Sequence, residues 1–411
     1  MRNSKNKPIR EILVSPEYSK WRIWLVVLLL ALGATLIAVS ASKLLGVKPG
    51  WFTVEASVQD SCSGDFTFQY LLGETGKKPN VEKRALIQKY DQVACDAYQI
   101  FHESKSFADL KNVCYLNTHP NEVVEVTQAL YKAFALLQQH QNRALYLAPV
   151  YGHYVGMFLC TDDWAAQDYD PGKDTEAAQF IAEAMTFAGN EEKVKLELLG
   201  NNQVKLCVAE DYLQFAKAYE ITAFIDFYWM KNAFIVDYMA DELISAGFTS
   251  GILSSYDGFH RTLGAPKESY SLNLFDRVGQ DIYPAAIFTY TDKMASVTLR
   301  NYSTDPLAVR QYYHWENGEI SSCHIDTADG MNKTAVNDLL GYSKTKSCAE
   351  ILLQLYPIYV AETLDTDALK ALPAKGVETV YVKDYVFYAS DTNAILSHFY
   401  AKGDISYKRN G

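Results

Sequence analysis

An uncharged apolar run near the N-terminus sets the strongest limit on how this chain folds. Residues 23–42 (IWLVVLLLALGATLIAVSAS) contain no Asp, Glu, Lys or Arg. At about 1.5 Å per residue, such a helix reaches roughly 30 Å, which is the thickness of the hydrocarbon core of a bilayer. The run therefore predicts one transmembrane helix over 23–42, and no second run of this kind follows in the sequence.

The charges around this run predict its orientation. Residues 1–22 carry six Lys or Arg against two Glu, whereas only Lys43 and Lys48 follow the run closely. The positive-inside rule then places 1–22 in the cytoplasm as a basic tip and the rest of the chain outside the cell membrane. A cleaved signal peptide, with a small-residue site at 39–41, is the alternative. The length of the segment before the run favours an uncleaved single-pass anchor.

The charge balance excludes one class of partner. The 411 residues carry a formal net charge of -11, from 38 Lys and Arg against 49 Asp and Glu. Because 1–22 is basic, the remainder is more acidic still, and an acidic surface repels phosphate backbones. We therefore expect no nucleic-acid partner.

The cysteines give no metal or redox motif. None of the seven forms a C-x-x-C pair, which argues against a zinc ribbon or a thioredoxin-like site. Their scattered spacing favours small buried hydrophobic residues, and a disulfide framework is the alternative. They are Cys62, Cys95, Cys114, Cys160, Cys207, Cys323 and Cys348.

The hydrophobic pattern after the anchor alternates between strand and helix periods. It predicts strands within 49–75, helices over 81–102, 122–140 and 176–188, a loop over 159–175, and a hairpin turning at Asn201-Asn202. Further on it predicts a strand ending near 226, a helix over 230–246 closed by Gly247, a strand over 250–256, a helix starting near 347 and a last strand over 378–390. This mixture indicates an α+β domain over 49–395, followed by a polar tail over 396–411.

Local catalytic motifs are missing from the sequence. There is no G-x-G-x-x-G, P-loop, H-E-x-x-H or G-x-S-x-G motif, and no His pair at metal-ligand spacing. From residue patterns alone, the chain is an anchored extracytoplasmic α+β domain.

Five passages nevertheless stand out in series. They are DFYWMKNAFIVD at 226–237, SSYDGFHRTLG at 254–264, YYHWENGEISSCHIDTADG at 312–330, AEILLQL at 349–355 and VETVYVKDYVFYASD at 377–391. In this order they resemble a known family, the ApbE flavin transferases, which are FAD:protein FMN transferases. The resemblance covers roughly 66–390 and implies the ApbE-like flavin transferase fold.

The resemblance implies a chemistry. Members of this family bind FAD with Mg²⁺ and transfer FMN to a Ser or Thr hydroxyl of a partner flavoprotein, a phosphoryl transfer in which a metal offsets developing charge. It implies catalytic roles for Asp226, Lys231 and Asn232. The lysine of the family aligns with Asn232, and Lys231 stands one position earlier. Asp226 is equally suited to cap the helix that follows it.

The resemblance also implies cofactor contacts, several of them at altered residues. The paired glycines of the family are replaced by Tyr228 and Trp229, and Cys323 takes the place of its histidine, beside His324. The implied cofactor-binding positions are Asn117, Tyr146, Tyr228, Trp229, Gly258, His324 and Asp326.

The metal position of the family corresponds to Glu350 and Gln354. These residues are four apart and share one helical face, and their oxygens are of the type that Mg²⁺ prefers. Ser347 and Glu350 also form an S-x-x-E capping box, which is the favoured reading of Glu350. Two hypotheses follow: a transferase with an adjusted site, or a pseudoenzyme acting as a binding or assembly subunit beside a flavoprotein or a respiratory membrane complex.

Overall fold

The computed structural model describes residues 20–45, 47–55, 61–265 and 269–410. The chain divides into two units, Met1–Pro49 and Gly50–Gly411. In the first unit, Lys20–Leu45 forms helix α1. Among the described residues, none of the helices meets the length and apolarity needed to cross a membrane. The predicted transmembrane helix over 23–42 is therefore not confirmed and stays a prediction, and most of the predicted basic tip over 1–22 lies outside the described residues.

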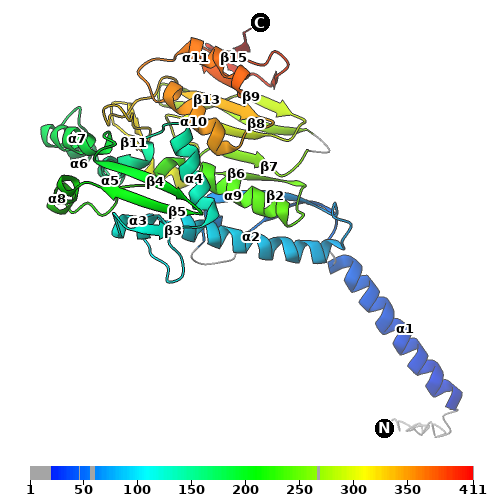
Figure 1. Ribbon diagram of the computed structural model, residues 1–411. Coiled ribbons are helices and arrows are strands. Elements are labelled where there is room, and N and C mark those ends of the chain that lie inside the picture. The colour runs from blue at the N-terminus through cyan, green and yellow to red at the C-terminus, as the bar shows by residue number, and fades with distance from the viewer. Residues whose placement is uncertain (1–19, 46, 56–60, 266–268, 411) are drawn as a thin grey trace, which may run out of the picture. The chain divides into compact units, whose positions relative to one another are not determined.

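The second unit is built on a nine-stranded sheet (Figure 1). Neighbouring strands are antiparallel except for the last pair, β15 and β19, which is parallel. In spatial order its strands are β1 (Gly50–Val54), β2 (Phe66–Leu72), β6 (Gly251–Ser255), β7 (Phe259–Thr262), β10 (Ala295–Arg300), β13 (Asp338–Ser343), β14 (Glu378–Lys383), β15 (Val386–Ala389) and β19 (Lys408–Arg409).

Smaller sheets and the helices complete this unit. The small sheets pair β16 (Ile395–Ser397) with β9 (Asp281–Tyr290) and β8 (Tyr270–Val278), β3 (Val123–Glu125) with β5 (Gln203–Val208) and β4 (Val194–Gly200), β11 (Tyr312–His314) with β12 (Ile320–Ser322), and β17 (Ala401–Lys402) with β18 (Ile405–Ser406). The helices are α2 (Pro79–Phe101), α3 (Val113–Thr118), α4 (Gln128–Gln139), α5 (Ala148–Phe158), α6 (Asp163–Ala166), α7 (Thr175–Ala188), α8 (Glu210–Ala218), α9 (Lys231–Ser245), α10 (Cys348–Tyr359) and α11 (Thr366–Ala371).

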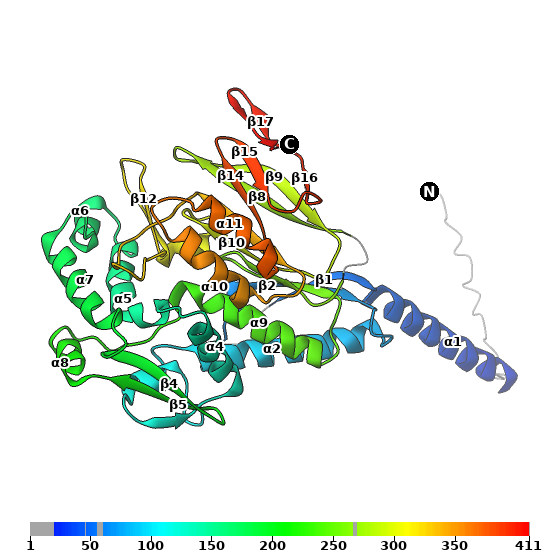
Figure 2. The ribbon, with the colours of Figure 1, turned by 45° about the horizontal axis from the view of Figure 1, so that its top comes forward.

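The large sheet is covered on both faces. Helices α9 and α10 pack on one face, with α2 beside α9, and the β8–β9–β16 sheet covers part of the other (Figure 2). Residues along β13 alternate between the two faces of the large sheet. Leu340 and Tyr342 join the apolar core beneath β9, whereas Gly341 faces α10. A Cβ at Gly341 would lie 2.6 Å from Leu355 Cδ1, so the absence of a side chain lets α10 approach the sheet closely.

Two local predictions are confirmed with their physical basis. The hairpin of β4 and β5 turns at Asn201 and Asn202, whose φ values of 49° and 60° are those of a two-residue turn that suits asparagine. Helix α9 ends before Gly247, which has φ +90°. Its predicted apolar stripe is fully buried, at Val236, Met239, Ala240 and Leu243.

Other predicted elements are wrong in detail. Residues 221–227 form no strand, although their pattern alternates. Within the predicted helix 122–140, Val123–Glu125 instead pairs with β5, and α4 begins after the capping residue Thr127. The predicted loop 159–175 contains the short helix α6. The predicted single strand 378–390 is the β14–β15 hairpin, because Asp384 and Tyr385 turn the chain with positive φ.

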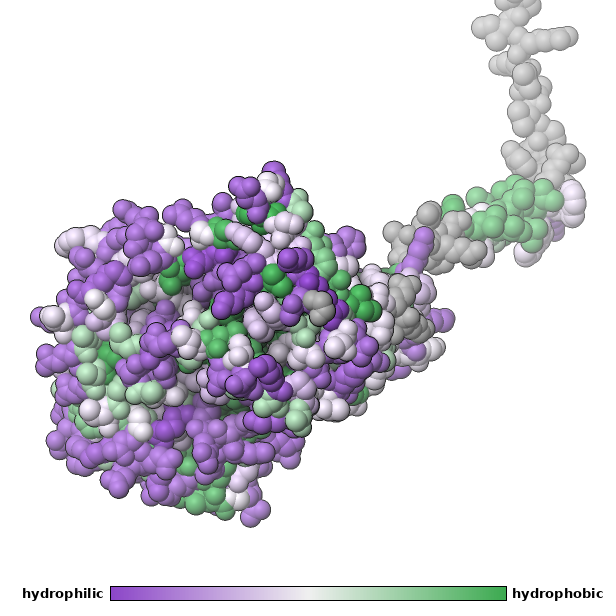
Figure 3. All heavy atoms as spheres, turned by 90° about the horizontal axis from the view of Figure 1, so that it is seen from above, coloured by the Kyte–Doolittle hydropathy of each residue, from purple (hydrophilic) through white to green (hydrophobic). Residues whose placement is uncertain are grey.

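The residues predicted as a polar tail, 396–411, contribute strands β17, β18 and β19 to the second unit. Tyr407 is 3% exposed and belongs to the core beneath β9, which explains why this segment is ordered. All seven cysteines are free thiols, and Cys62, Cys114, Cys323 and Cys348 are buried. Large exposed apolar side chains gather on α1 between Trp21 and Ile37 (Figure 3).

Candidate functional site

The three residues expected to be catalytic lie in one cavity of about 260 Å³ at the start of α9. Asp226 is the penultimate residue of the irregular segment 221–227, and its Oδ1 accepts a hydrogen bond from the Tyr228 amide over 2.8 Å. That bond begins the short 3₁₀ turn that leads into α9, where Lys231 and Asn232 occupy the first turn. Asp226 therefore bonds the start of this turn and does not cap α9 itself, whose N-cap residue is Met230. It also lines the cavity, and its catalytic role stays a prediction.

Three further carboxylates line the same cavity. Asp65 follows β1 and precedes β2, Glu103 follows α2, and Asp257 lies in the turn between β6 and β7. Sequence reasoning missed Asp65 and Glu103 as site residues, because each stands singly at the end of an element. Asp257 lies within the passage 254–264 that carries the resemblance, but it is not among the site residues that the resemblance implies.

Lys231 balances part of this charge. Its Nζ lies 3.4 Å from Glu103 Oε2. Burial alone would lower the pKa of Lys231, but the charges of Glu103 and Asp226 outweigh it and the pKa is raised. The pKa of Glu103 is lowered by Lys231, although burial acts in the other direction. Glu103 and Lys231 are therefore a charged pair at neutral pH.

Asp226 and Asp257, unlike Glu103, have raised pKa values. Burial raises the pKa of each to about 6, and the negative charge of Glu103 adds to the rise at Asp226. Asn232 Nδ2 donates to Asp257 Oδ2 over 2.9 Å. The carbonyl oxygen of the Asn232 side chain (Oδ1) and the second carboxylate oxygen of Asp257 (Oδ1) are buried without a hydrogen-bond partner.

The charge of the cavity does not suit a dinucleotide. Four carboxylates line it, against the two cations Lys231 and Arg310. The diphosphate of FAD carries negative charge, which this lining repels at short range. The residues present at this position therefore do not fit FAD.

Tyr228 and Trp229 point in different directions. Tyr228 has φ +43°, an uncommon conformation for a bulky residue at a position where the family has glycine. Its hydroxyl donates to the Arg310 carbonyl over 2.8 Å, and its ring lies 4.8 Å from that of Tyr151. Trp229 is buried, stacked 5.6 Å from Tyr356. Tyr228 lines the cavity, and Trp229 belongs to the core.

Three other predicted cofactor residues have structural partners away from the cavity. His324 is buried, lies 4.8 Å edge-on to Trp229, and has its pKa lowered to about 3 by burial. Asp326 accepts from Lys333 Nζ over 2.9 Å in a turn. The Tyr146 hydroxyl accepts from the Leu196 amide over 2.9 Å, and Tyr146 lines a different cavity.

Asn117 and Gly258, two other predicted cofactor-binding residues, have roles in the backbone structure. Asn117 Oδ1 accepts from the amides of Phe224 and Ile225, and its Nδ2 donates to the Ile225 carbonyl. These bonds hold the irregular segment 221–227, which contains Asp226. Gly258 has φ +101°, and a Cβ there would lie 2.4 Å from the Thr298 carbonyl oxygen. It allows close approach of the backbone to β10.

The predicted metal position is occupied by internal contacts. Glu350 Oε1 accepts from Lys346 Nζ over 3.0 Å, and Oε2 accepts from the Ser347 amide over 2.9 Å. Ser347 Oγ accepts from the Glu350 amide in return, which completes the capping box. Gln354 Nε2 donates to the Glu350 carbonyl, and its Oε1 is buried without a partner.

One free amide oxygen is not a magnesium site, because Mg²⁺ needs carboxylate or water oxygens in octahedral array. Within the described ranges, no group of three or more His, Cys, Asp or Glu side chains could hold a metal ion. The residues at the family's metal position therefore do not fit Mg²⁺.

Comparison with known proteins identifies the architecture. No protein-family model matches the sequence, and no curated protein matches it. Among solved structures, the ApbE protein of Thermotoga maritima aligns with a TM-score of 0.53 and 14% identity over 85% of this chain and 97% of that chain. The flavin transferase ApbE of Vibrio cholerae aligns with a TM-score of 0.56 and 14% identity over 84% and 98%, and a single-residue variant of it gives 0.53.

The expectation drawn from the five sequence passages is thus confirmed at the level of the fold. The aligned region spans nearly the whole length of each neighbour. The chain has the ApbE flavin-transferase fold.

Proposed function

We propose that this protein is a membrane-anchored, extracytoplasmic, flavin-transferase-like protein that has lost metal-dependent FMN transfer. It serves as a binding or assembly subunit for a flavoprotein or a respiratory membrane complex. The observation that carries this proposal is the engagement of both Glu350 carboxylate oxygens, by Lys346 and by the Ser347 amide. A carboxylate held in this way caps a helix and has no oxygen directed at a metal.

The acidic cavity supports the same conclusion. Asp65, Asp226 and Asp257 line the space in which the resemblance places the cofactor. Transfer of a phosphoryl group requires positive charge around the phosphate oxygens, from a metal or from Arg and Lys. The carboxylates that line this cavity supply negative charge instead.

The anchor is proposed from the sequence. The uncharged run 23–42 follows a basic segment and is long enough to cross the hydrocarbon core. The exposed apolar side chains between Trp21 and Ile37 are of the kind that lipid covers. This orientation leaves Gly50–Gly411 outside the cytoplasm.

An active FAD:protein FMN transferase is the second candidate. It is favoured by one observation, that Asp226, Lys231 and Asn232 converge on one cavity as the resemblance implies.

The two candidates are separated by assay of the full-length protein in detergent. It is incubated with FAD, Mg²⁺ and an acceptor flavoprotein, and AMP release and covalent flavin are measured. We expect no turnover and no binding of FAD in the millimolar range. Turnover that is lost in Glu350→Ala and kept in Glu319→Ala, an exposed control, would overturn the proposal.

A further inference from the structure

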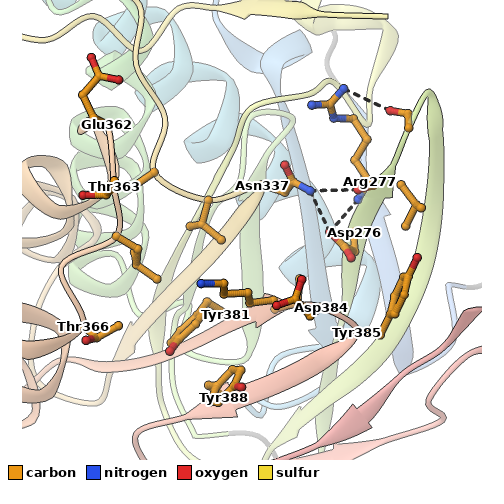
Figure 4. Close-up of a pocket in the computed structure, with 17 residues that line it drawn as sticks. Asp276, Arg277, Asn337, Glu362, Thr363, Thr366, Tyr381, Asp384, Tyr385 and Tyr388 are labelled. Carbon is orange, nitrogen blue, oxygen red and sulfur yellow. Dashed lines mark hydrogen bonds between the residues drawn. The ribbon is translucent and has the colours of Figure 1, made fainter.

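A second and larger cleft lies apart from the cavity of Asp226 and shares none of its lining residues. Its volume is about 860 Å³. Figure 4 shows that the β14–β15 hairpin, with Tyr381 and Tyr388, forms one side, while Arg277 at the end of β8 and Thr363 before α11 stand on others. The fold alone explains neither the size of this cleft nor its chemistry.

The hairpin presents an aromatic surface to the cleft. Tyr381 and Tyr388 are directly opposite each other in the register of β14 and β15, so both side chains project from the same face. Their rings are stacked, with centroids 5.0 Å apart and planes 12° apart. Both residues are only partly buried although the pair is large and apolar. Such a pair offers a flat apolar surface with hydroxyl groups at its edge.

The turn of the hairpin is in an uncommon conformation. Asp384 and Tyr385 have φ values of +51° and +62°, where turns of this kind favour Asn or Gly. A bulky residue there costs free energy and is a marker of functional positions. The ring of Tyr385 packs edge-on against Tyr407, at 5.4 Å, and this contact fixes it at the rim of the cleft. This contact therefore packs the turn against the buried ring of Tyr407.

Two cations line the cleft without an acidic partner. Arg277 Nη1 donates to the carbonyls of Gly279 and Gly318 over 3.2 and 3.4 Å, and its Nε is buried without a hydrogen bond. In the part of the chain that the structure describes, neither Arg277 nor Lys383 forms an ion pair. Unpaired cations are notable on a protein whose net charge is -11.

The acids of the cleft differ from one another in availability. Asp276 is buried and accepts from Tyr407 Oη over 3.1 Å and from Asn337 Nδ2 over 3.2 Å. Glu362 Oε1 lies 3.5 Å from Lys333 Nζ. Asp384 is exposed on the turn. The cleft therefore offers one exposed cation, Lys383, with a few oxygen acceptors and threonine hydroxyls around an aromatic surface.

We propose that this cleft binds an acidic saccharide, with a sugar ring on the Tyr381–Tyr388 pair and its carboxylate paired with Lys383. The apolar C–H face of a sugar ring matches an aromatic surface. Lys383 is exposed and lies two residues after Tyr381 in β14, so it projects from the same face of the hairpin as the tyrosine pair and can bind the carboxylate. Asp384 and the threonine hydroxyls accept and donate hydrogen bonds to ring hydroxyls. A sugar ring carries hydroxyl groups around its whole edge for Asp384 and the threonines to bond, whereas a nucleobase does not, so a saccharide matches this lining better than a nucleotide.

The test is titration calorimetry of the full-length protein in detergent with a galacturonic acid trimer. Maltotriose serves as the neutral saccharide and AMP as a nucleotide. We expect the acidic trimer to bind, maltotriose to bind at least about tenfold more weakly, and AMP not to bind. Tyr388→Leu should weaken the acidic trimer by about threefold to tenfold.

Two charge variants keep the test decisive. Because Arg277 also holds two carbonyl groups, Arg277→Gln can disturb the fold, whereas Lys383 is exposed and Lys383→Gln leaves the backbone bonds intact. We expect Lys383→Gln to weaken the acidic trimer and to leave maltotriose unchanged, and Lys402→Gln, at an exposed lysine outside the cleft, to change neither. No binding of the acidic trimer, equal binding of both saccharides, or preference for AMP would each overturn the proposal.

Discussion

The side-chain amide of Asn232 donates to the carboxylate of Asp257 over 2.9 Å, and the Asn232 amide oxygen and the second Asp257 oxygen are both buried without a partner. The two residues come from α9 and from the turn after β6, so the bond ties the start of the helix to the sheet. It does not remove the cost of burying the Asp257 charge. The acidic cavity is consequently a source of pH-dependent stability.

We expect the burial of ionised Asp257 to lower the unfolding free energy as pH rises from about 4 to 6. Burial raises the pKa of Asp257 from its usual 3.8 to about 6. In that window the folded protein retains a proton that the unfolded chain releases, so stability falls as pH rises. Asp257→Asn should reduce the fall by about 1 to 3 kcal/mol. Urea unfolding at pH 4.5 and pH 7 measures it.

The control for this prediction is Asp168→Asn, at an exposed residue. It should leave the pH dependence of the unfolding free energy unchanged. An equal fall with pH in wild type and in Asp257→Asn would show that Asp257 is ionised in the folded protein throughout this range.

Ser347→Ala should destabilise the protein through the end of α10. The substitution removes the acceptor for the Glu350 amide and leaves the capping box incomplete. Loss of a serine cap costs roughly 1 kcal/mol. Denaturant unfolding at pH 7 measures the change, and Thr186→Ala, which removes an exposed hydroxyl bonded within its own helix, is the control. Equal values for the two variants would contradict the capping role.

The sequence predicts the periodic parts of this fold well. The apolar stripe of α9 and the Asn201-Asn202 turn depend on residues near one another in the chain, so their patterns are sufficient. The pattern of 221–227 misleads, because its alternating apolar residues are held as an irregular segment by Asn117, more than a hundred residues earlier. Alternation alone cannot distinguish a strand from such a segment.

The candidate site was predictable only in part. Asp226, Lys231 and Asn232 are close in sequence, and a helix start brings them together on purely local grounds. Asp65 and Glu103 reach the same cavity from distant elements, and no spacing rule links them to α9. The net negative charge of the cavity, which decides against a dinucleotide, depends on these distant residues.

Gly258 gives a test of backbone approach. A Cβ at this position would lie 2.4 Å from the Thr298 carbonyl oxygen, in addition to the strain of φ +101°. Gly247 has a similar φ of +90° and open space around it. We expect Gly258→Ala to lower the unfolding free energy by at least about 1 to 3 kcal/mol more than Gly247→Ala, measured by denaturant unfolding. Equal losses would mean that the steric contact relaxes and that only φ matters.

Asn117→Ala should loosen the segment that positions Asp226. The amides of Phe224 and Ile225 and the Ile225 carbonyl would lose their partners inside the protein. Each buried unpaired group costs about 1 to 3 kcal/mol, so we expect a total loss of roughly 2 to 5 kcal/mol. Denaturant unfolding measures the loss, and hydrogen exchange of residues 221–227 should become faster than that of α9.

Asn117→Asp separates the two kinds of bond at this position. Its carboxylate keeps the two acceptor bonds to Phe224 and Ile225 and loses only the donor bond to the Ile225 carbonyl. At low pH the carboxyl group is protonated and can also donate to the Ile225 carbonyl. We therefore expect Asn117→Asp to lose less stability than Asn117→Ala at low pH. Asn317→Ala, at an exposed turn, controls for removal of an amide. If Asn117→Ala changes neither stability nor exchange of 221–227, the segment is held by its own apolar burial, since Phe224 and Ile225 are themselves buried.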